Sequence, residues 1–192
     1  MKKEDLLKQI AEKGYDVGFG AKKHLATYDI ICKAPGWISF LSIAIGIIAL
    51  ATEFELNSLS SALLIIFGIS ALYIEPYRNQ KEDYEAVGKK LTGYFHDLKG
   101  LCARVEHDES GSLSGYINEL KDIDRKFQGV AISKQVFISD AYAHYKFFWQ
   151  MQINWIEQYR SFSFWRDKIP LSAYVACVLI LMSLLSILFG VF

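Results

Sequence analysis

The stretch that decides the fold is A-P-G-W-I-S-F-L-S-I-A-I-G-I-I-A-L-A-T, residues 34–52, which contains no charged side chain. At about 1.5 Å of rise per residue, a helix of this length covers about 28 Å, close to the roughly 30 Å hydrocarbon core of a bilayer. A second uncharged stretch occupies residues 56–74, and a third occupies residues 169–192. Because backbone polar groups in lipid must be satisfied within the segment, we expect each stretch to form a membrane-spanning helix.

Only Glu53-Phe54-Glu55 separates the first two stretches, which predicts a tight transmembrane hairpin over residues 34–76. This loop has two acids and no basic residue, whereas the other ends of the three stretches are basic. The basic residues concerned are Lys22, Lys23, Lys33, Arg78, Lys81, Arg166 and Lys168. The positive-inside rule therefore predicts a multi-pass protein with its N-terminus and its middle segment in the cytoplasm. Aromatic residues that would anchor the cytoplasmic interface are Trp37, Tyr73, Tyr77 and Trp165.

The middle segment, residues 77–168, has apolar residues at alternating steps of three and four, which is a heptad pattern. The first seam consists of Tyr84, Val87, Leu91, Tyr94, Leu98, Leu101 and Val105. A second seam runs from Leu113 to Val130 after an expected turn at residues 108–112, and we expect a third helix from about Ser133 to Tyr159. The pattern predicts an all-α protein with a cytoplasmic helical bundle or coiled coil. Whether the seams pair within one chain or between copies stays open.

The segment 1–33 is basic and amphipathic, and it can either lie on the membrane surface or pack on the cytoplasmic helices. Gly14, Gly18 and Gly20 argue against a single unbroken helix here. The prolines border the apolar stretches and suggest helix boundaries at Pro35, Pro76 and Pro170. The expected organisation is thus an N-terminal segment 1–33, a hairpin 34–76, a cytoplasmic domain 77–168 and a C-terminal span 169–192.

The sequence carries no pattern typical of a catalytic, cofactor or metal site. Its 21 basic and 21 acidic residues cancel, so no binding to nucleic acid is expected. Three distant cysteines indicate no disulfide framework, and the four histidines lack metal-ligand spacing. A membrane enzyme would need an unrecognised site around His96 or His144, so we expect a protein that is not an enzyme and has no cofactor.

The three apolar stretches contain no Asp, Glu, Lys, Arg or His, which argues against secondary transport. They contain small residues instead, at spacings that let helices approach closely. These are Ser39, Ser42, Gly46, Ser61, Gly68, Ser172, Ala176, Ser186 and Gly190. Two interpretations stay open: packing within one chain, or contact between protomers in which Ser39, Ser42 and Ser61 line a narrow pore gated by a hydrophobic constriction.

Several motifs resemble one known family. They are F-G-A-K-K-H-L-A-T-Y-D (residues 19–29) leading into P-G-W-I (35–38), the E-P exit at residues 75–76, N-W-I-E-Q-Y-R (154–160) and F-W-R-D-K-I-P (164–170). Together with the acidic hairpin they are similar to the SLATT domains, two-span effector modules of bacterial conflict systems. The resemblance covers most of the chain, and its motifs are architectural. The third apolar stretch is a departure from the two-span family pattern.

The resemblance implies a membrane effector in antiphage defence at the inner membrane. Such an effector is expected to oligomerise and to form a pore or disrupt the membrane when a partner sensor or nucleotide-signalling protein triggers it, so that the cell dies or arrests. No catalytic residue follows from the resemblance. The alternative is a non-conducting membrane anchor that holds a soluble partner.

Overall fold

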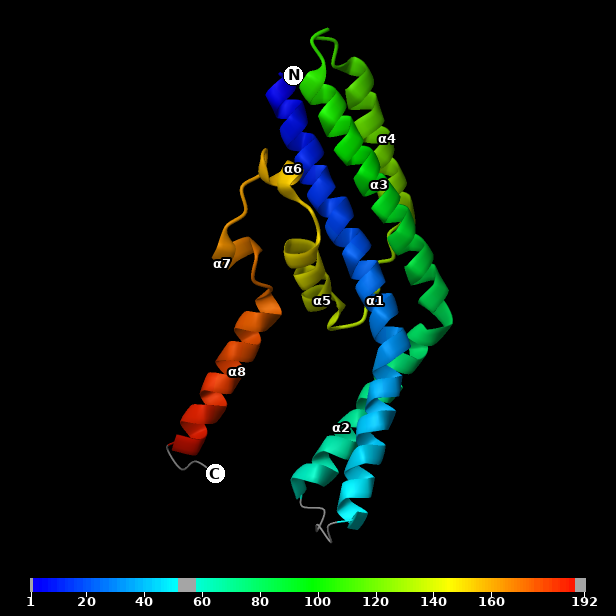
Figure 1. The fold of residues 1–192 in the computed structure, drawn as a ribbon, viewed down its shortest axis with the longest axis vertical. Coiled ribbons are helices and arrows are strands. Elements are labelled where there is room, and N and C mark those ends of the chain that lie inside the picture. The colour runs from blue at the N-terminus through cyan, green and yellow to red at the C-terminus, as the bar shows by residue number, and fades with distance from the viewer. Residues whose placement is uncertain (1, 52–57, 189–192) are drawn as a thin grey trace.

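A computed structural model describes residues 2–51 and 58–188, and most of these residues are helical (Figure 1). The elements are α1 (Lys3–Ala51), α2 (Ser58–Ile74), η1 (Glu75–Gln80), α3 (Lys81–His107), α4 (Ser114–Val130), α5 (Ser139–Tyr145), η2 (Lys146–Gln150), α6 (Asn154–Glu157), α7 (Phe164–Asp167) and α8 (Leu171–Leu188). No strand occurs within these described ranges, which confirms the predicted all-α class. The expected acidic loop of the hairpin lies outside the described residues.

Helix α1 runs through both parts of the molecule. Its first half lies inside the helical body, and its second half forms one arm of the hairpin (Figure 1). It packs against α3 in the body and against α2 in the hairpin. The helix end expected at Pro35 is wrong, since α1 continues through this residue. Proline removes one helical hydrogen bond, and packing on α3 and α2 holds the helix on either side of it. The expected boundary between the segments 1–33 and 34–76 therefore lies within one continuous helix.

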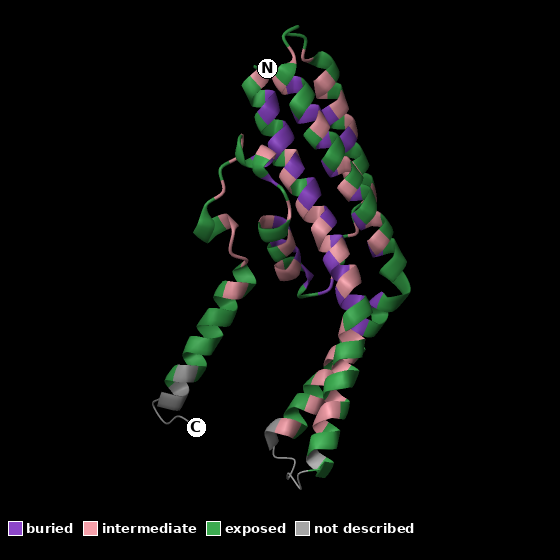
Figure 2. Cartoon of the chain, viewed as in Figure 1, coloured by how far each residue is buried: buried purple, intermediate pink, exposed green. Residues whose placement is uncertain are grey.

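The N-terminal half of α1 is the centre of the body rather than a surface segment. Leu6, Ile10 and Val17 are fully buried, and Figure 2 shows this stripe of buried residues along α1. Of the two alternatives left open by the sequence, the structure therefore favours packing against the other helices. Burial of a large apolar side chain contributes about 1.5–3 kcal/mol, which outweighs the cost of a glycine within the helix.

The expected break at the glycines of α1 is wrong as well. A Cβ atom added at Gly14 would lie 2.3 Å from the Trp155 ring, and one added at Gly18 would lie 2.7 Å from the Phe95 ring. These glycines let aromatic rings from α6 and α3 touch the α1 backbone directly. In this helix glycine therefore marks close packing and not a helix end.

Helices α3 and α4 complete the body. The turn at residues 108–112 and the helix from about 113 to 130 are confirmed by the gap between α3 and α4 and by the bounds of α4. Five residues of the proposed seam are buried, namely Tyr84, Leu91, Leu98, Leu101 and Val105, while Val87 and Tyr94 are half-buried. The seam packs on α1 and α4 of the same chain. Gly88, Phe95 and Cys102 join it in the core, which widens the stripe beyond a strict heptad.

The hairpin arms are apolar and exposed. Two helices are long and apolar enough to cross a membrane, and they include residues 34–48 and 60–74; only 11% of each apolar window is buried. A soluble core helix of this kind would be mostly buried, so their exposure favours a lipid environment. Helix α8 is apolar and exposed too, and it stands apart from the hairpin in Figure 1, but its described apolar part is shorter. Its crossing of a membrane stays a prediction.

The single helix expected from about Ser133 to Tyr159 is wrong. Residues 131–138 form an irregular segment, here called the strap, and the short elements α5, η2 and α6 follow it. Element η2 is a π-helical turn that places Phe147 in the core and leaves Trp149 exposed. The strap passes from α4 to α5 across α1, at the level where the body meets the hairpin (Figure 1).

Candidate functional site where the strap joins the body to the hairpin

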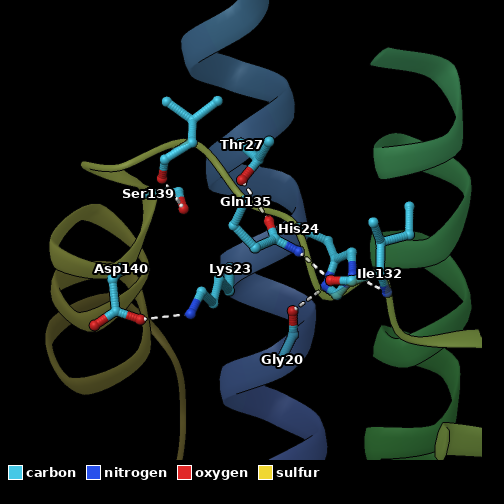
Figure 3. Close-up of polar contacts among 9 residues, drawn as sticks. Gly20, Lys23, His24, Thr27, Ile132, Gln135, Ser139 and Asp140 are labelled. Atoms are coloured by element: carbon cyan, nitrogen blue, oxygen red, sulfur yellow. Dashed lines mark hydrogen bonds and ion pairs between the residues drawn. The ribbon is translucent and has the colours of Figure 1, made fainter. Parts of the chain in front are cut away.

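One buried histidine of α1 fixes the start of the strap. The Nδ1–H of His24 donates to the carbonyl oxygen of Gly20 at 2.7 Å, and its Nε2 accepts the backbone N–H of Ile132 at 3.0 Å (Figure 3). Both ring nitrogens are therefore used, one as donor and one as acceptor. This arrangement requires the neutral ring.

The pKa of His24 agrees with a neutral ring. Burial lowers this pKa below its ordinary value, the hydrogen bond to Gly20 opposes the shift, and the charge of Lys23 adds to it. Lys23 itself points to the other side of α1 and pairs with Asp140 of α5 at 2.9 Å. The tilted ring of Tyr84 from α3 lies 6.2 Å from the imidazole, centroid to centroid. Neighbouring groups thus offer no carboxylate that would favour the charged imidazolium.

A second pair of side chains fixes the middle of the strap, one turn further along α1. The hydroxyl of Thr27, fully buried, donates to Oε1 of Gln135 at 2.6 Å. The Nε2 of Gln135 donates in turn to the carbonyl oxygen of Ile132 at 2.7 Å (Figure 3). Ser139 closes the end of the strap by donating to the carbonyl oxygen of Val136 at 2.6 Å. The strap is thereby shaped by its own side chains and by α1.

Three tyrosines hold the strap from the opposite side. Tyr84 of α3 donates to the carbonyl oxygen of Lys134 at 2.6 Å, and Tyr77 of η1 donates to that of Gln135 at 3.4 Å. Tyr73, near the end of α2, accepts the backbone N–H of Phe137 at 3.1 Å. The strap is therefore hydrogen-bonded to the body through α1 and α3 and to the hairpin through α2. These bonds connect the body and the hairpin through one segment.

The charged groups around this junction are paired. Lys146 of η2 lies 2.5 Å from Asp29 of α1, and Lys33 lies 3.1 Å from the same carboxylate. Burial raises the pKa of Asp29, but the hydrogen bonds from the two lysines outweigh burial, so its pKa lies below the ordinary value. Hydrogen bonding with Tyr73, followed by burial, raises the pKa of Tyr77 to about 12, so this phenol stays protonated.

The expected interface aromatics do not all share one environment. Trp37, Tyr73 and Trp165 are 63%, 45% and 70% exposed, as rings in contact with lipid headgroups would be. Tyr77 is only 6% exposed. Its ring packs with Ile74, Tyr84 and other apolar residues at the junction, so it lacks the exposure of an interface anchor. Tyr77 therefore lies next to the end of the hairpin, as expected, but its ring is buried in the protein instead of exposed.

Among the described residues of the hairpin, the two glycines predicted to support close packing have open surroundings. A Cβ atom added at Gly46 or at Gly68 would have nothing within 4 Å. Ser39 and Ser61 are exposed, and Ser42 is half-buried and donates to the Ile38 carbonyl oxygen at 2.8 Å. In α8, Ser172 and Ala176 are exposed; the Ser186 side chain and Gly190 lie outside the described residues. The surface is therefore open at the described small residues except Ser42, which is half-buried.

No constellation typical of a catalytic or metal centre occurs among the described residues. No group of three or more His, Cys, Asp or Glu side chains lies close enough together there to hold a metal ion. His96 is exposed on α3, and His144 is buried between the rings of Phe19 and Phe148. The candidate functional site is therefore the hydrogen-bonded junction between the body and the hairpin.

These features define a class of protein: a helical body joined through a hydrogen-bonded strap to an exposed, apolar two-helix hairpin of the kind that lies in a membrane. The chain belongs to the family described as SMODS and SLOG-associating 2TM effector domain 6, abbreviated SLATT, whose model matches residues 1–177. No curated protein and no solved structure matches the chain. The predicted family is confirmed, and with the two apolar helices it places this chain at a membrane as an effector of conflict systems.

The sequence interpretation missed the roles of His24, Thr27 and Gln135. The sequence nevertheless contained a signal for this junction. Residues 19–29 carried much of the family resemblance, and they contain four of the residues that organise the junction. These are Gly20, His24, Thr27 and Asp29. Polar residues at positions 24 and 27 interrupt an otherwise apolar face at a spacing of one helical turn. Such an interruption indicates a buried partner for each.

Proposed function

We propose that this chain is a membrane effector of a bacterial antiphage system that oligomerises through its hairpin and opens the inner membrane when a partner sensor triggers it. The effector class follows from the family. The pore, the oligomer and the trigger are the parts that we add. Loss of the membrane potential would then kill or arrest the infected cell.

The observation that carries this proposal is the open face of the hairpin. Gly46 in α1 and Gly68 in α2 have free space where a side chain would be, although both lie on helices rich in exposed apolar residues. Small residues in membrane helices support close helix contacts. Because neither glycine has such a contact in its own chain, a second copy is the natural partner.

The exposed serines give the same surface a weakly polar character. Ser39 and Ser61 are exposed, on different arms of the hairpin. In a ring of hairpins these hydroxyls could line a narrow passage without ionisable groups, and a hydrophobic constriction could close it. We propose this lining for the open state.

The strap supplies a route for the signal. A sensor that binds the body shifts the equilibrium only if it contacts the closed and open states differently. The strap is bonded to α1 and α3 in the body and to α2 in the hairpin. In our proposal the body and the N-terminus face the cytoplasm, as the basic residues at the junction favour. The sensor would be the nucleotide-signalling or sensing protein that the family name indicates.

The test is Gly46→Leu in cells that carry the complete system and are challenged with phage, with a membrane-potential dye as the readout. A matched control is Ile48→Phe, which adds bulk at a 56% exposed position about 200° around the same helix. We expect depolarisation with the wild-type chain and with Ile48→Phe, and none with Gly46→Leu at equal expression. An unchanged potential with the wild-type chain would contradict the proposal.

The alternative function, a non-conducting membrane anchor for a soluble partner, is distinguished by the same variant. If the hairpin only anchors the body, Gly46→Leu leaves both partner binding and protection against phage intact. If the hairpin conducts, partner binding is retained and protection is lost. Co-purification with the sensor measures the first quantity, and plating efficiency measures the second.

A further inference from the structure

A groove lies beneath the strap where the two hairpin helices leave the body. It has a volume of about 490 Å³, within the range of sites that hold small ligands. Its walls come from α1, α2 and the strap and include Ile38, Phe67, Ile69, Val136 and Phe137. Ser70 is the one lining residue with an aliphatic hydroxyl, and that hydroxyl donates to the Ile66 carbonyl oxygen at 2.8 Å. The groove has no charged residue in its lining.

The strap has two chemically different sides at this point. Lys134 and Gln135 face the tyrosines of the body, and the Lys134 ammonium lies 5.0 Å from the centre of the Tyr77 ring. The next apolar residues, Phe137 and Ile138, line the groove and are 83% and 55% exposed. Two adjacent large apolar side chains in water would be unfavourable, so their exposure indicates an apolar environment.

The groove is continuous with the apolar outer surface of the hairpin. Ile66 and Ile69 line it and are 54% and 62% exposed, and they belong to the same helix face that meets lipid in a bilayer. The glycine faces that we assign to contact between copies do not line it. Helix α8 stands apart from the hairpin in Figure 1, and none of the lining residues belongs to the described part of α8. The occupant is therefore sought in the bilayer and not in the protein.

We infer that this groove holds the acyl chain of a membrane phospholipid, with Phe137 and Ile138 of the strap inserted in the same leaflet. The acyl chain supplies the apolar contacts that the groove walls lack. No charged or unpaired polar group in the lining disfavours its binding. The occupied groove supports the strap from the membrane side while His24, Thr27 and Tyr84 hold it from the body. This inference depends on the membrane location and is independent of pore formation.

The first test is native mass spectrometry of the full chain extracted from phosphatidylcholine nanodiscs. Ile69→Trp puts an indole into the groove, and Leu72→Trp is the matched control, because Leu72 is 75% exposed on the same helix and does not line the groove. We expect lipid to be retained by the wild-type chain and by Leu72→Trp and to be lost from Ile69→Trp. Equal retention by both variants, or lipid loss from both, would overturn the inference.

The second test distinguishes a lipid from another occupant. Phe137→Trp, at an exposed position, reports its surroundings in nanodiscs whose phosphatidylcholine carries bromine at acyl carbons 6 and 7. We expect its added fluorescence, relative to the wild-type chain, to be quenched by these lipids and not by a brominated water-soluble quencher. The reverse pattern would place the strap in water and overturn the inference. A change of subunit number in Ile69→Trp with lipid binding unchanged would assign the groove to a second copy and overturn it as well.

Discussion

The glycines of α1 and α2 have opposite surroundings in the body and in the hairpin. In the body, Gly14 and Gly18 lie against aromatic rings so closely that an added Cβ would clash. In the hairpin, Gly46 and Gly68 have no neighbour within 4 Å of that position. The same residue type therefore marks completed packing in one region and an open surface in the other.

The comparison also extends to polar groups. At the strap, the buried hydroxyl of Thr27 and the buried imidazole of His24 have partners within the chain. The exposed serines of the hairpin lie on surfaces that a single copy leaves open. The body thus packs its apolar core within one chain, whereas the hairpin exposes apolar surface that lipid or further copies would cover.

The largest expected effect is the difference in folding stability between the Gly18→Leu and Gly46→Leu variants. At Gly18 the first added atom would lie 2.7 Å from the Phe95 ring and 2.9 Å from the Phe147 ring, both in the core. Overpacking of this kind destabilises a core by about 3 kcal/mol. Circular dichroism of the detergent-solubilised chain should show a large loss of thermal stability for Gly18→Leu.

Gly46→Leu should leave that thermal transition nearly unchanged, because exposed substitutions stay within about 0.5 kcal/mol. If Gly46→Leu destabilised the isolated chain as strongly as Gly18→Leu, the distinction between a closed body and an open hairpin would be lost.

A smaller effect is expected when the strap loses one bond to the body. Tyr84→Phe removes the hydroxyl that donates to the Lys134 carbonyl oxygen at 2.6 Å and keeps the buried ring. A hydrogen bond of this kind contributes about 1 kcal/mol. Hydrogen exchange should increase at residues 132–137 and stay unchanged at the α3–α4 end of the body. Tyr94→Phe, on a half-buried ring further along α3, is the control.

The strap should also depend on pH through His24. Since burial holds its pKa below the ordinary value, the folded state favours the neutral ring, and the unfolded state binds the proton first as pH falls. The contribution of the neutral His24 ring to the stability of the folded state is therefore complete above about pH 6.5. It is lost progressively as the pH falls below this value. A charged ring can no longer accept the Ile132 N–H, so the protection factor of that amide, which corrects its exchange for the intrinsic effect of pH, should fall as the pH decreases from 7.5 to 5.5. His24→Asn should abolish this fall; a wild-type protection factor that stays constant over the same range would contradict the assignment.

The smallest effect is expected at the ion pair between α1 and η2. Lys146 and Asp29 are about one fifth exposed and share their charges with Lys33. Such partly solvated pairs contribute about 0.5 kcal/mol. Lys146→Met keeps the alkyl stem and should lower the melting temperature only slightly. A loss as large as that of Gly18→Leu would mean that the junction depends on charge rather than on packing.

The sequence was most informative where one helix face or one long apolar run carries the signal. The described parts of the first two apolar stretches, residues 34–51 and 58–74, are helical within α1 and α2, and the helix expected from Leu113 to Val130 appears as α4. Periodicity is a property of neighbouring residues, so these elements could be predicted without knowing what they pack against. The turn between α3 and α4 follows from local chemistry in the same way.

The sequence misled where distant residues decide the structure. Residues 133–138 were expected to begin a helix, yet His24 and Thr27, each 108 positions away from its partner, bind the strap instead. Pro35 was expected to end a helix that tertiary packing carries through it. The glycines of α1 were interpreted by helix propensity, whereas rings from other elements explain them. Rules based on neighbouring residues, such as helix propensity and apolar spacing, cannot predict contacts between residues that are far apart in the sequence.

The most direct test of the whole account is the extraction of membranes from cells that express the full chain. An exposed apolar hairpin embedded in the bilayer predicts that the chain stays in the membrane pellet after an alkaline carbonate wash and dissolves only in detergent. Recovery of the chain in the wash, folded and monodisperse without detergent, would show that its apolar helices are covered by protein and would contradict the account.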